Sequence, residues 1–534
     1  MEARQALEGD RAPLGGLQRA EVRDVLAWLR LLADPQDAAA VVRALTRPPI
    51  ELRQVDLARV IQLSRRRKLN MIDGLRAAGE SPQVPAEGHE RIARFLALHT
   101  ELETHARSSS AAQLLSLIGE RLDAARPLAI GDRSADGLDG LRSAVQAYES
   151  QRPGATLTEL ADELGAVAAP APAADAKPLD VEVAMTRVRD ELLAQVGSLG
   201  AQLGELRLDT ELDLAHGVAR FLELVKLSAL AQRSEGQSLE QALADVNARV
   251  QAAATPLERE VLASSPLDEE LLHGELAAGR ASGDERSLAA FLPRRGDGLA
   301  LSASDIETYR SCPLRYKYAR VLRIPTAQTV AQRFGIVMHQ VLERYHADGA
   351  QTLGELLALL DAAWRRSGLG EQEAELLEKG RAALRRYHER LATESSEPIW
   401  FERGFSFSLG PHQIRGRVDR VDRIAGSDGE VFELIDYKTS RPRSAEQLEQ
   451  DVQLALYALA AREAWGLAST REAYYYVLDD ERVRLGVEDG TPRWIEETVE
   501  EVAGGILAQA FEPTPSYAVC SMCEYRIACP AAEK

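Results

Sequence analysis

Apolar residues recur at helical spacing through the first hundred residues of the chain. Segment 21–35 has the sequence EVRDVLAWLRLLADP and stops at an Asp-Pro pair, which is typical of a helix end. Segments 38–51, 55–78 and 90–106 repeat this pattern of apolar faces and breaker residues. We therefore expect a series of amphipathic helices up to about residue 109. The apolar positions in the first helix are Val22, Val25, Leu26, Trp28, Leu29 and Leu32.

Two shifts in composition divide the chain. Segment 165–178, GAVAAPAPAADAKP, is rich in Ala and Pro and is typical of a semi-rigid linker. Helical patterns return after it and end at FLPRRGDG, residues 291–298. We predict a helical domain at 1–164, a linker at 165–180, a second helical region at 181–295 and an α/β domain at 296–534.

The last region changes from helical to alternating patterns. Segments 413–424 and 430–440 are strand-like and are separated by AGSDG, which is a hairpin signal. Segment 473–487, AYYYVLDDERVRLGV, indicates a second strand pair around its Asp-Asp turn. The chain is therefore expected to be mixed, with a mainly helical first half and an α/β domain after it.

The bulk composition limits the class of protein. A chain of 534 residues is too long for one core, so two to four domains are expected. Its apolar runs are shorter than about 18 residues and its first residues lack a signal-peptide core, so we expect a cytoplasmic protein with no membrane contact. The net charge of −19 means that any binding to nucleic acid must use local clusters of Lys and Arg.

Two carboxylates and a lysine are concentrated in the predicted hairpin. Asp419 lies in its first strand, Asp436 ends its second, and Lys438 follows two residues later. Adjacent strands bring both carboxylates to one end, and Lys438 shares a strand face with Asp436 because side chains repeat every two residues. Asp436 also ends a largely apolar run, where a carboxylate needs a partner.

Paired carboxylates are suited to a hard divalent ion such as Mg²⁺ or Mn²⁺, which takes oxygen ligands and bridges to phosphate. Such an ion lowers the pKa of a bound water and stabilises charge in the transition state, and a nearby ammonium orients the nucleophile. The alternative is an ordinary surface ion pair, which is the commoner origin of an isolated Asp-x-Lys pattern.

Segments 416–423 (GRVDRVDR), 433–440 (ELIDYKTS) and 453–457 (QLALY) resemble the PD-(D/E)xK nucleases of the RecB type, over roughly residues 299–534. The resemblance implies a restriction-endonuclease-like fold and metal-dependent hydrolysis of DNA. It makes Asp419 and Asp436 metal ligands and Lys438 the catalytic lysine, and it adds the backbone carbonyl of Tyr437 as a ligand.

The helix after this hairpin carries a further element of the resemblance. Gln453 and Tyr457 lie four residues apart on one helix face and match a Q-x-x-x-Y element that positions substrate beside the site. Upstream, His339 lies off the apolar stripe of segment 333–346. A lone helical histidine is usually structural, but G-x-x-x-H-x-x-L-E resembles the first motif of the family, which implies that His339 is a metal ligand. Glu343, one turn later, is a weaker candidate for supporting it.

The chain contains four cysteines, and they are unevenly placed. Cys312 precedes the predicted nuclease core, whereas Cys520, Cys523 and Cys529 follow it in the segment CSMCEYRIACP. Four thiolates from both ends of a domain suit either a [4Fe–4S] cluster or a structural Zn²⁺, and structural zinc is the commoner of the two. The resemblance favours the cluster, because iron–sulfur RecB-like nucleases place one cysteine before the core and three after it. Its role would be structural.

The segment around Cys312 also combines basic residues with tyrosines. Such a combination tracks single-stranded DNA through phosphate contacts and base stacking, whereas the alternative is a partly buried helix with a solvated basic edge. The residues predicted to bind DNA are Arg310, Arg315, Lys317 and Arg320.

The first half of the chain resembles part of another family. Segment 20–49 resembles the 2B subdomain of UvrD-like superfamily 1 helicases, and Val181–Leu193 resembles their last motif, in which Arg187 would contact the ATP γ-phosphate. The sequence G-x-x-x-x-G-K-[ST], which cradles ATP phosphates, does not occur anywhere in the chain. We therefore expect no ATPase or helicase activity from this chain alone, and Arg187 is interpreted as a relic or a surface arginine.

Together these patterns predict a Mg²⁺- or Mn²⁺-dependent deoxyribonuclease that acts on single-stranded DNA or DNA ends in repair or recombination. A separate helicase motor is the expected partner. The alternatives are a non-catalytic DNA-binding scaffold protein within a helicase complex, or a helicase that is active only with a separate motor chain.

Overall fold

The computed structural model describes residues 20–122, 134–167, 210–231, 239–263, 287–347, 349, 352–425, 430–467, 470–485 and 493–533. The chain divides into two compact units. The helical unit comprises Met1–Ser287 together with Ser516–Lys534, and the α/β unit comprises Leu288–Pro515. The second unit is thus inserted into the sequence of the first. A helical N-terminal region followed by a mixed α/β region agrees with the expected fold class, while the individual domain boundaries stay a prediction.

The first part of the helical unit is built from short amphipathic helices, as the periodicity predicts. Helix α2 ends before the Asp-Pro pair, and its apolar face is buried, including Trp28, whose ring lies 5.2 Å from that of Phe95. Asp37 begins α3 by accepting a hydrogen bond from the N–H of Ala40 at 3.0 Å. The helices are α2 (Ala20–Ala33), α3 (Ala38–Thr46), α4 (Gln54–Arg67), α5 (Met71–Ala78), α6 (Ala86–Ala106), α7 (Ala111–Arg121), α8 (Ser134–Gln151) and α9 (Leu157–Val167).

The C-terminal segment belongs to this helical unit. It contains α23 (Tyr517–Cys520) and short 3₁₀ turns at Arg526–Ala528 and Pro530–Glu533. Arg23 of α2 donates to the carbonyls of Arg526, Ile527 and Cys529, the last two at 3.1 Å. Arg43 of α3 donates to the Ile527 carbonyl at 3.0 Å.

Both of these arginines are buried, with 5% and 2% of their surfaces exposed. A buried guanidinium needs hydrogen-bond acceptors, and here the main chain of the C-terminal segment supplies them. The last residues described are therefore fixed to the first helices by backbone recognition. We refer to these contacts of Arg23 and Arg43 as the arginine–carbonyl clamp.

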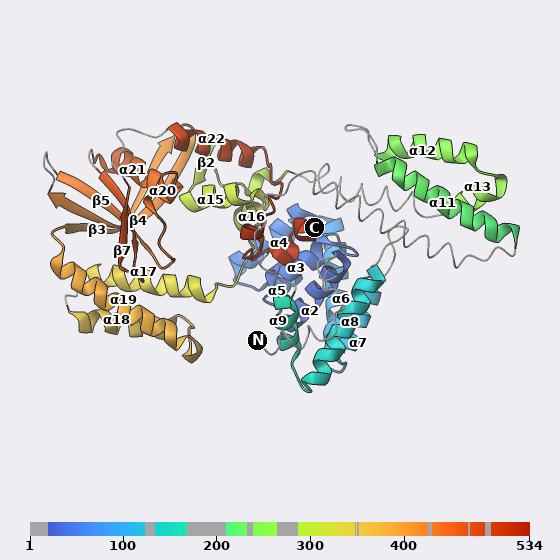
Figure 1. The fold of residues 1–534 in the computed structure, drawn as a ribbon, viewed down its shortest axis with the longest axis horizontal. Helices are drawn as coiled ribbons and strands as arrows, with labels where there is room; N and C mark the ends of the chain where they lie inside the picture. Colours follow the sequence, from blue (N-terminus) through green and yellow to red (C-terminus); the bar gives the residue numbers. More distant parts are fainter. Residues whose placement is uncertain are drawn as a thin grey trace. The chain divides into compact units, whose positions relative to one another are not determined.

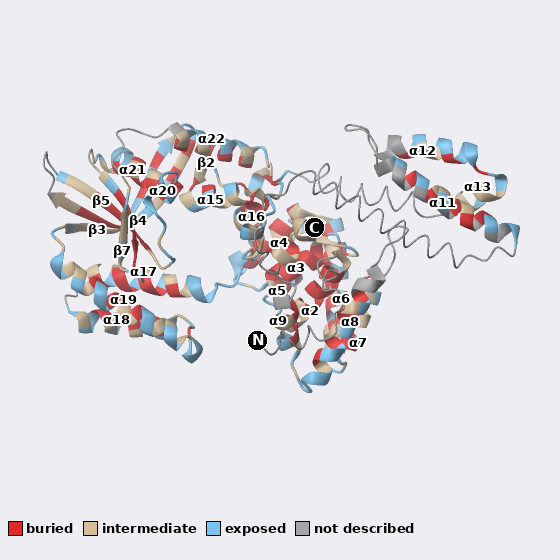
Figure 2. Cartoon of the chain, in the orientation of Figure 1, coloured by how far each residue is buried: buried red, intermediate tan, exposed pale blue. Residues whose placement is uncertain are grey.

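Helices α11 (Glu211–Ala231), α12 (Leu239–Ala253) and α13 (Pro256–Ala263) pack on one another. Three large apolar residues of α11 are exposed, and they are Leu214, Phe221 and Val225. Figure 2 shows both exposed and buried stretches along this helix. Arg187 and the segment Val181–Leu193 lie outside the described residues, as does most of the predicted linker. No helix among the described residues is both long and apolar enough to cross a bilayer.

The α/β unit is organised around a seven-stranded mixed sheet in the order β1-β2-β4-β5-β6-β7, with β3 paired to β4. The predicted hairpin is confirmed: β4 and β5 pair antiparallel, and so do β6 and β7 around the Asp-Asp turn. Strands β5 and β6 are parallel, with α21 in the connection between them. The strands are β1 (Arg294–Arg295), β2 (Gly298–Leu301), β3 (Glu397–Leu409), β4 (His412–Ala425), β5 (Glu430–Lys438), β6 (Thr470–Tyr476) and β7 (Glu481–Arg484).

Helices cover both faces of this sheet (Figure 1). Helices α17 (Val330–Ala347), α18 (Leu353–Arg366) and α19 (Ala374–Thr393) enclose an apolar core with Ile435, Tyr437 and Tyr475 of the strands. Helix α21 (Val452–Trp465) contacts β3 and β6 on the other face. Because side chains alternate along a strand, Asp436 and Tyr474 belong to the face that α21 covers. The remaining helices are α15 (Ala303–Ser311), α16 (Pro313–Tyr316), α20 (Ala445–Leu448) and α22 (Arg493–Leu507).

The segment around Cys312 differs from the single helix that its sequence predicts. Helix α15 ends at Ser311, and Cys312 is extended, with φ −165° and ψ 111°. Pro313 then begins α16, which continues into a π-helical turn at Lys317–Leu322. Proline disfavours helical geometry in the residue before it and lacks the N–H that would continue the ladder, so the helix breaks at the cysteine.

Candidate active site

Three carboxylates form a row across three adjacent strands. The register of β3 and β4 sets Glu402 opposite Asp419, because the residues on either side of both are paired. The register of β4 and β5, continued by one residue, sets Asp419 opposite Asp436. Strands in a sheet lie about 4.8 Å apart, so the backbones of the three acidic residues are direct neighbours across the sheet. We call Glu402, Asp419 and Asp436 the carboxylate row.

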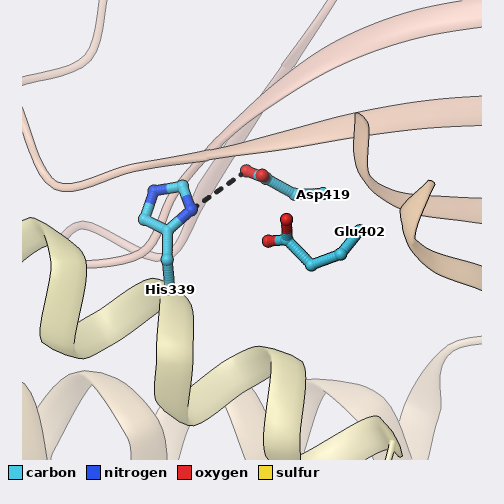
Figure 3. A group of neighbouring side chains, drawn as sticks. All are labelled: His339, Glu402 and Asp419. Atoms are coloured by element: carbon cyan, nitrogen blue, oxygen red, sulfur yellow. Dashed lines mark ion pairs between the residues drawn. The ribbon is translucent and has the colours of Figure 1, made fainter. Parts of the chain in front are cut away.

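Helix α17 adds an imidazole to this row. His339 Nδ1 lies 3.3 Å from Asp419 Oδ2. Figure 3 shows His339 extending from its helix toward Asp419, with the carboxylate of Glu402 beside them. One ligand atom from each of the three lies within 4.8 Å of the other two. His339 and Asp419 were both predicted ligands, and the structure brings them together.

Electrostatics in this group follow from burial and from close negative charges. Burial lowers the pKa of His339, but the hydrogen bond to Asp419 and the charges of Asp419 and Asp436 outweigh it, so the pKa is raised. Burial and the charge of Asp436 raise the pKa of Asp419, against the opposing effects of His339 and the Tyr437 N–H, which donates to Asp419 Oδ2 at 2.7 Å. Two carboxylates that repel each other in a buried position are stabilised by a cation.

Asp436 and Lys438 lie together with the two predicted residues of α21. Lys438 Nζ is 2.7 Å from Asp436 Oδ2 and donates to Gln453 Oε1 at 2.8 Å. Gln453 Nε2 donates to Asp436 Oδ1 at 2.7 Å, and the Tyr457 hydroxyl lies 2.8 Å from the same oxygen. Burial lowers the pKa of Lys438, but Asp436 outweighs this and raises it, which keeps the ammonium charged.

The two oxygens of Asp436 have different partners. Oδ1 accepts from Gln453 and Tyr457, whereas the buried Oδ2 is paired with the Lys438 ammonium at 2.7 Å. Lys438 neutralises only part of the negative charge of Asp419 and Asp436, and a divalent cation would neutralise the rest. One imidazole and three carboxylates form a donor set that is rich in hard oxygen ligands, which suits Mg²⁺ or Mn²⁺. The residues present therefore fit the predicted metal.

Tyr474 supports Lys438 and was not found in the sequence. The Lys438 ammonium lies 4.4 Å from the centre of the Tyr474 ring. The Tyr474 hydroxyl donates to Asp451 Oδ1 at 2.7 Å, and Asp451 caps α21. The same hydroxyl lies 3.2 Å from Gln453 Oε1. Tyr474 thus connects the lysine to the start of the helix that carries Gln453 and Tyr457.

Glu402 was also missed, because the sequence analysis did not predict β3. An alternating pattern was present before the Gly410-Pro411 turn, where Phe405 and Phe407 point to the same side. The backbone of Glu402 has a φ of 46°, in the left-handed region that non-glycine residues rarely adopt. Such conformations concentrate at functional sites, where surrounding structure maintains them.

A buried polar network lies behind the site, on the face that α17 and α19 cover. The Tyr437 and Tyr387 hydroxyls are 2.8 Å apart, and Arg420 Nη1 donates to Tyr387 at 3.0 Å. His346 Nε2 lies 2.6 Å from the same hydroxyl. Tyr437 therefore joins the two faces: its ring is anchored in the network while its N–H holds Asp419. The charged members of the network are Arg420, Asp422, Glu394, Arg482 and Glu433.

The cysteine segment forms consecutive tight turns. The N–H of Cys523 bonds to the carbonyl of Cys520, that of Arg526 to Cys523, and that of Cys529 to Arg526. All four cysteines of the chain are free of disulfides, and Cys312 is buried. Burial lowers the pKa of Arg526, and the charges of Cys520, Cys523 and Cys529 oppose this effect.

The four residues predicted to bind DNA are not equivalent. Arg310 and Arg320 are exposed, and Arg320 pairs with Asp305 at 2.6 Å. Arg315 is half-buried. Lys317 is buried, with its ammonium 5.9 Å from the centre of the Phe511 ring. Binding of DNA by these four residues stays a prediction.

Comparison with known families identifies one domain. Residues 300–530 match the model of the PD-(D/E)XK nuclease superfamily. The matched range contains every residue of the candidate site and the four cysteines. This part of the chain is therefore a PD-(D/E)XK nuclease superfamily domain. The match extends from the α/β unit into the C-terminal segment that the helical unit holds.

Individual proteins show weaker similarity. The chain is 24% identical to the Gene 69 protein of Mycobacterium phage D29 over 275 residues, which are 43% of this chain and 96% of the relative. It is 22% identical to the Gene 69 protein of Mycobacterium phage L5, over 43% of this chain and 95% of that protein. It is 27% identical over 209 residues to an ATP-dependent helicase/deoxyribonuclease subunit of Acetivibrio thermocellus, and this match covers 31% of this chain and 18% of the relative.

Proposed function

We propose that the PD-(D/E)XK domain at 300–530 is a metal-dependent deoxyribonuclease. The observation that carries the proposal is the carboxylate row with His339 at one end and Lys438 at the other. The superfamily match and the similarity to a helicase/deoxyribonuclease protein support it. The substrate would be single-stranded DNA or DNA ends, and the process would be repair or recombination.

The proposed ligands of Mg²⁺ or Mn²⁺ are those expected from the sequence together with Glu402. They are His339, Glu402, Asp419, Asp436 and the backbone carbonyl of Tyr437. When bound, the ion would lower the pKa of a water and neutralise charge on the phosphate. Lys438, held by Gln453 and Tyr474, would orient that water for in-line attack. Gln453 and Tyr457 would keep Asp436 in place, since both contact its Oδ1.

A matched pair of variants tests this function. In Asp436→Asn the shape of the side chain is kept and its charge is lost, so cleavage of labelled DNA in Mn²⁺ should fall by at least about 100-fold, the scale of a lost metal or general-base contact. Asp361→Asn, which alters an exposed carboxylate paired with Arg381, should cleave like the unmodified protein. Equal cleavage by both variants, or none by the unmodified protein with any DNA and either metal, would contradict the proposal.

We further propose that Cys312, Cys520, Cys523 and Cys529 ligate a structural [4Fe–4S] cluster, with Zn²⁺ as the alternative. Four cysteines that form no disulfide and the C-x2-C-x5-C spacing of the three C-terminal ones in the sequence support the cluster. Anaerobically purified protein should contain iron and sulfide and absorb visible light, and Cys523→Ser should lose both. Stoichiometric zinc without iron would favour the alternative.

We also propose that the nuclease works with a separate helicase motor. The similarity to a helicase/deoxyribonuclease protein, together with the lack of an ATP-cradling motif in the chain, supports a nuclease that works with a separate helicase. Addition of ATP to the purified protein should then leave cleavage unchanged. An ATP-dependent increase would instead place a motor activity in this chain.

A further inference from the structure

The ion pair between Arg417 and Glu402 joins the candidate metal group to an exposed basic residue. Arg417 Nη1 lies 3.1 Å from Glu402 Oε2, and the two side chains are 62% and 19% exposed. Glu402 also has a ligand atom within 4.8 Å of His339 and Asp419. One carboxylate is therefore positioned to serve either the arginine or a cation.

The position of Arg417 on β4 is fixed relative to the site. Arg417 precedes Asp419 by two residues, so its side chain leaves the same face of the strand. Its carbonyl lies 2.8 Å from the Tyr457 hydroxyl, which also reaches Asp436 Oδ1. The backbone of Arg417 is thus held by the same residue that holds Asp436, while its guanidinium is exposed.

Cation binding would weaken this ion pair. An exposed Arg–Glu pair is worth at most about 1 kcal/mol, and a divalent cation on Glu402 would withdraw the negative charge that attracts Arg417. The guanidinium would also be repelled by the cation. It would then be a planar donor beside the site, where a phosphate of the DNA strand is the complementary partner.

Resting on the proposed nuclease function, we propose that Arg417 binds a phosphate of the DNA strand, and that it does so only when a divalent cation occupies the site. Without the cation, Glu402 holds the arginine. Binding of the cation thus increases the affinity for DNA through Arg417, which does not itself bind the metal. We call this exchange of partners the switch.

Equilibrium binding of a fluorescent single-stranded oligonucleotide to the full chain tests this proposal. Binding is measured in EDTA and in Ca²⁺, which takes the same oxygen ligands, and gels verify that the DNA is intact. In Ca²⁺, Arg417→Ala should weaken binding about tenfold, the scale of one charged hydrogen-bonded contact. In EDTA the same variant should bind within about twofold of the unmodified protein.

Arg415→Ala is the matched control, because Arg415 is exposed on the same face of β4, two residues farther from the row. Its effect should be the same in EDTA and in Ca²⁺. Glu402→Gln should free the arginine and strengthen binding in EDTA, and Arg417→Ala in that background should remove the gain. Melting curves verify that each variant is folded.

Two results would overturn the proposal. One is an equal loss of affinity for Arg417→Ala in both conditions, and the other is no loss in Ca²⁺. Both are independent of the Asp436→Asn cleavage test. In one outcome, Asp436→Asn loses cleavage as proposed while the effect of Arg417→Ala on DNA affinity is the same in EDTA and in Ca²⁺. In that case the nuclease function stands, and the cation-dependent role of Arg417 is wrong. If no nuclease activity exists and the dependence on Ca²⁺ holds, the site binds metal and DNA without cleaving.

Discussion

The two units both bury arginine side chains, but they neutralise them differently. In the helical unit, Arg23 and Arg43 donate to main-chain carbonyls of the C-terminal segment, and Arg43 also pairs with Asp24 at 2.7 Å. In the α/β unit, Arg420 pairs with Asp422 of its own strand, and Arg482 of β7 pairs with Glu433 of β5. Both arginines also pair with Glu394, which follows α19. Every residue has a carbonyl group, so the first arrangement depends on the course of the backbone and not on which side chains the segment carries. The second arrangement recognises particular side chains and therefore fixes the register of the strands.

Because of this difference, we expect that loss of one buried acidic group lowers the stability of the α/β unit more than loss of one arginine contact lowers that of the helical unit. Glu433 is fully buried and contacts Arg482 at 2.9 Å and Arg484. Glu433→Ala leaves a buried positive charge without this partner and should destabilise the unit by about 3–5 kcal/mol. Hydrogen exchange of peptides from β5 measures this loss. Glu430→Ala, which removes an exposed partner of Arg423, should change the same exchange by less than about 1 kcal/mol.

Arg43→Lys breaks the clamp without removing its charge. A lysine lacks the planar fork that reaches Ile527, Ala20 and Asp24, so the helical unit should lose about 2–3 kcal/mol. Limited proteolysis should then release the segment after Pro515. Arg30→Lys, which alters a half-exposed pair with Asp37, should leave the segment protected. Equal protection in both variants would show that the clamp does not hold the segment.

Acid should weaken the α/β unit through His346. Burial, with a smaller effect from Arg420, lowers the pKa of His346 to about 3 from an ordinary value of 6.5. Between these values the unfolded chain takes up a proton that the folded unit excludes. Stability is therefore present above about pH 6.5 and falls toward pH 3, by at most about 1.4 kcal/mol per pH unit. Urea unfolding at several pH values should show a shallower slope for His346→Gln.

The smallest expected effect comes from metal. At ten times its dissociation constant, Mn²⁺ should stabilise the α/β unit by about 1.4 kcal/mol, because it binds the folded state alone. Hydrogen exchange in β4 should slow accordingly, whereas exchange in α2 and α3 should not change. Asp419→Asn should abolish the effect. Slower exchange in α2 would mean that the cation binds elsewhere in the chain.

The sequence predicts local features of this molecule better than distant ones. The hairpin that carries Asp419 and Asp436 follows from alternation and a turn signal, whereas α21 was expected from the family resemblance of QLALY. The break at Cys312 was missed, although Pro313 provides the physical reason for it. Glu402 was missed because β3 was not predicted, and its left-handed backbone is one that glutamate rarely adopts.

Hydrophobic periodicity does not predict contacts between distant parts of the chain. Arg23 and Cys529 are 506 residues apart, and nothing in the pattern of either segment indicates the other. The roles of Lys438, Gln453 and Tyr457 rest on resemblance to a family, and the geometry adds which atoms meet. Tyr474 and Arg417 become visible only once strand register and side-chain distances are known.

The arginine–carbonyl clamp has a consequence for protein synthesis. The ribosome makes α2 and α3 early, but the carbonyls that Arg23 and Arg43 bind follow the whole of residues 288–515. Until then, two cations destined for burial lack these acceptors. A chain whose translation stops at Pro515 would carry every residue of the carboxylate row and still leave its first helices incomplete. Such a truncated product should be degraded because its first helices are incompletely folded, although translation stopped far from them in the sequence.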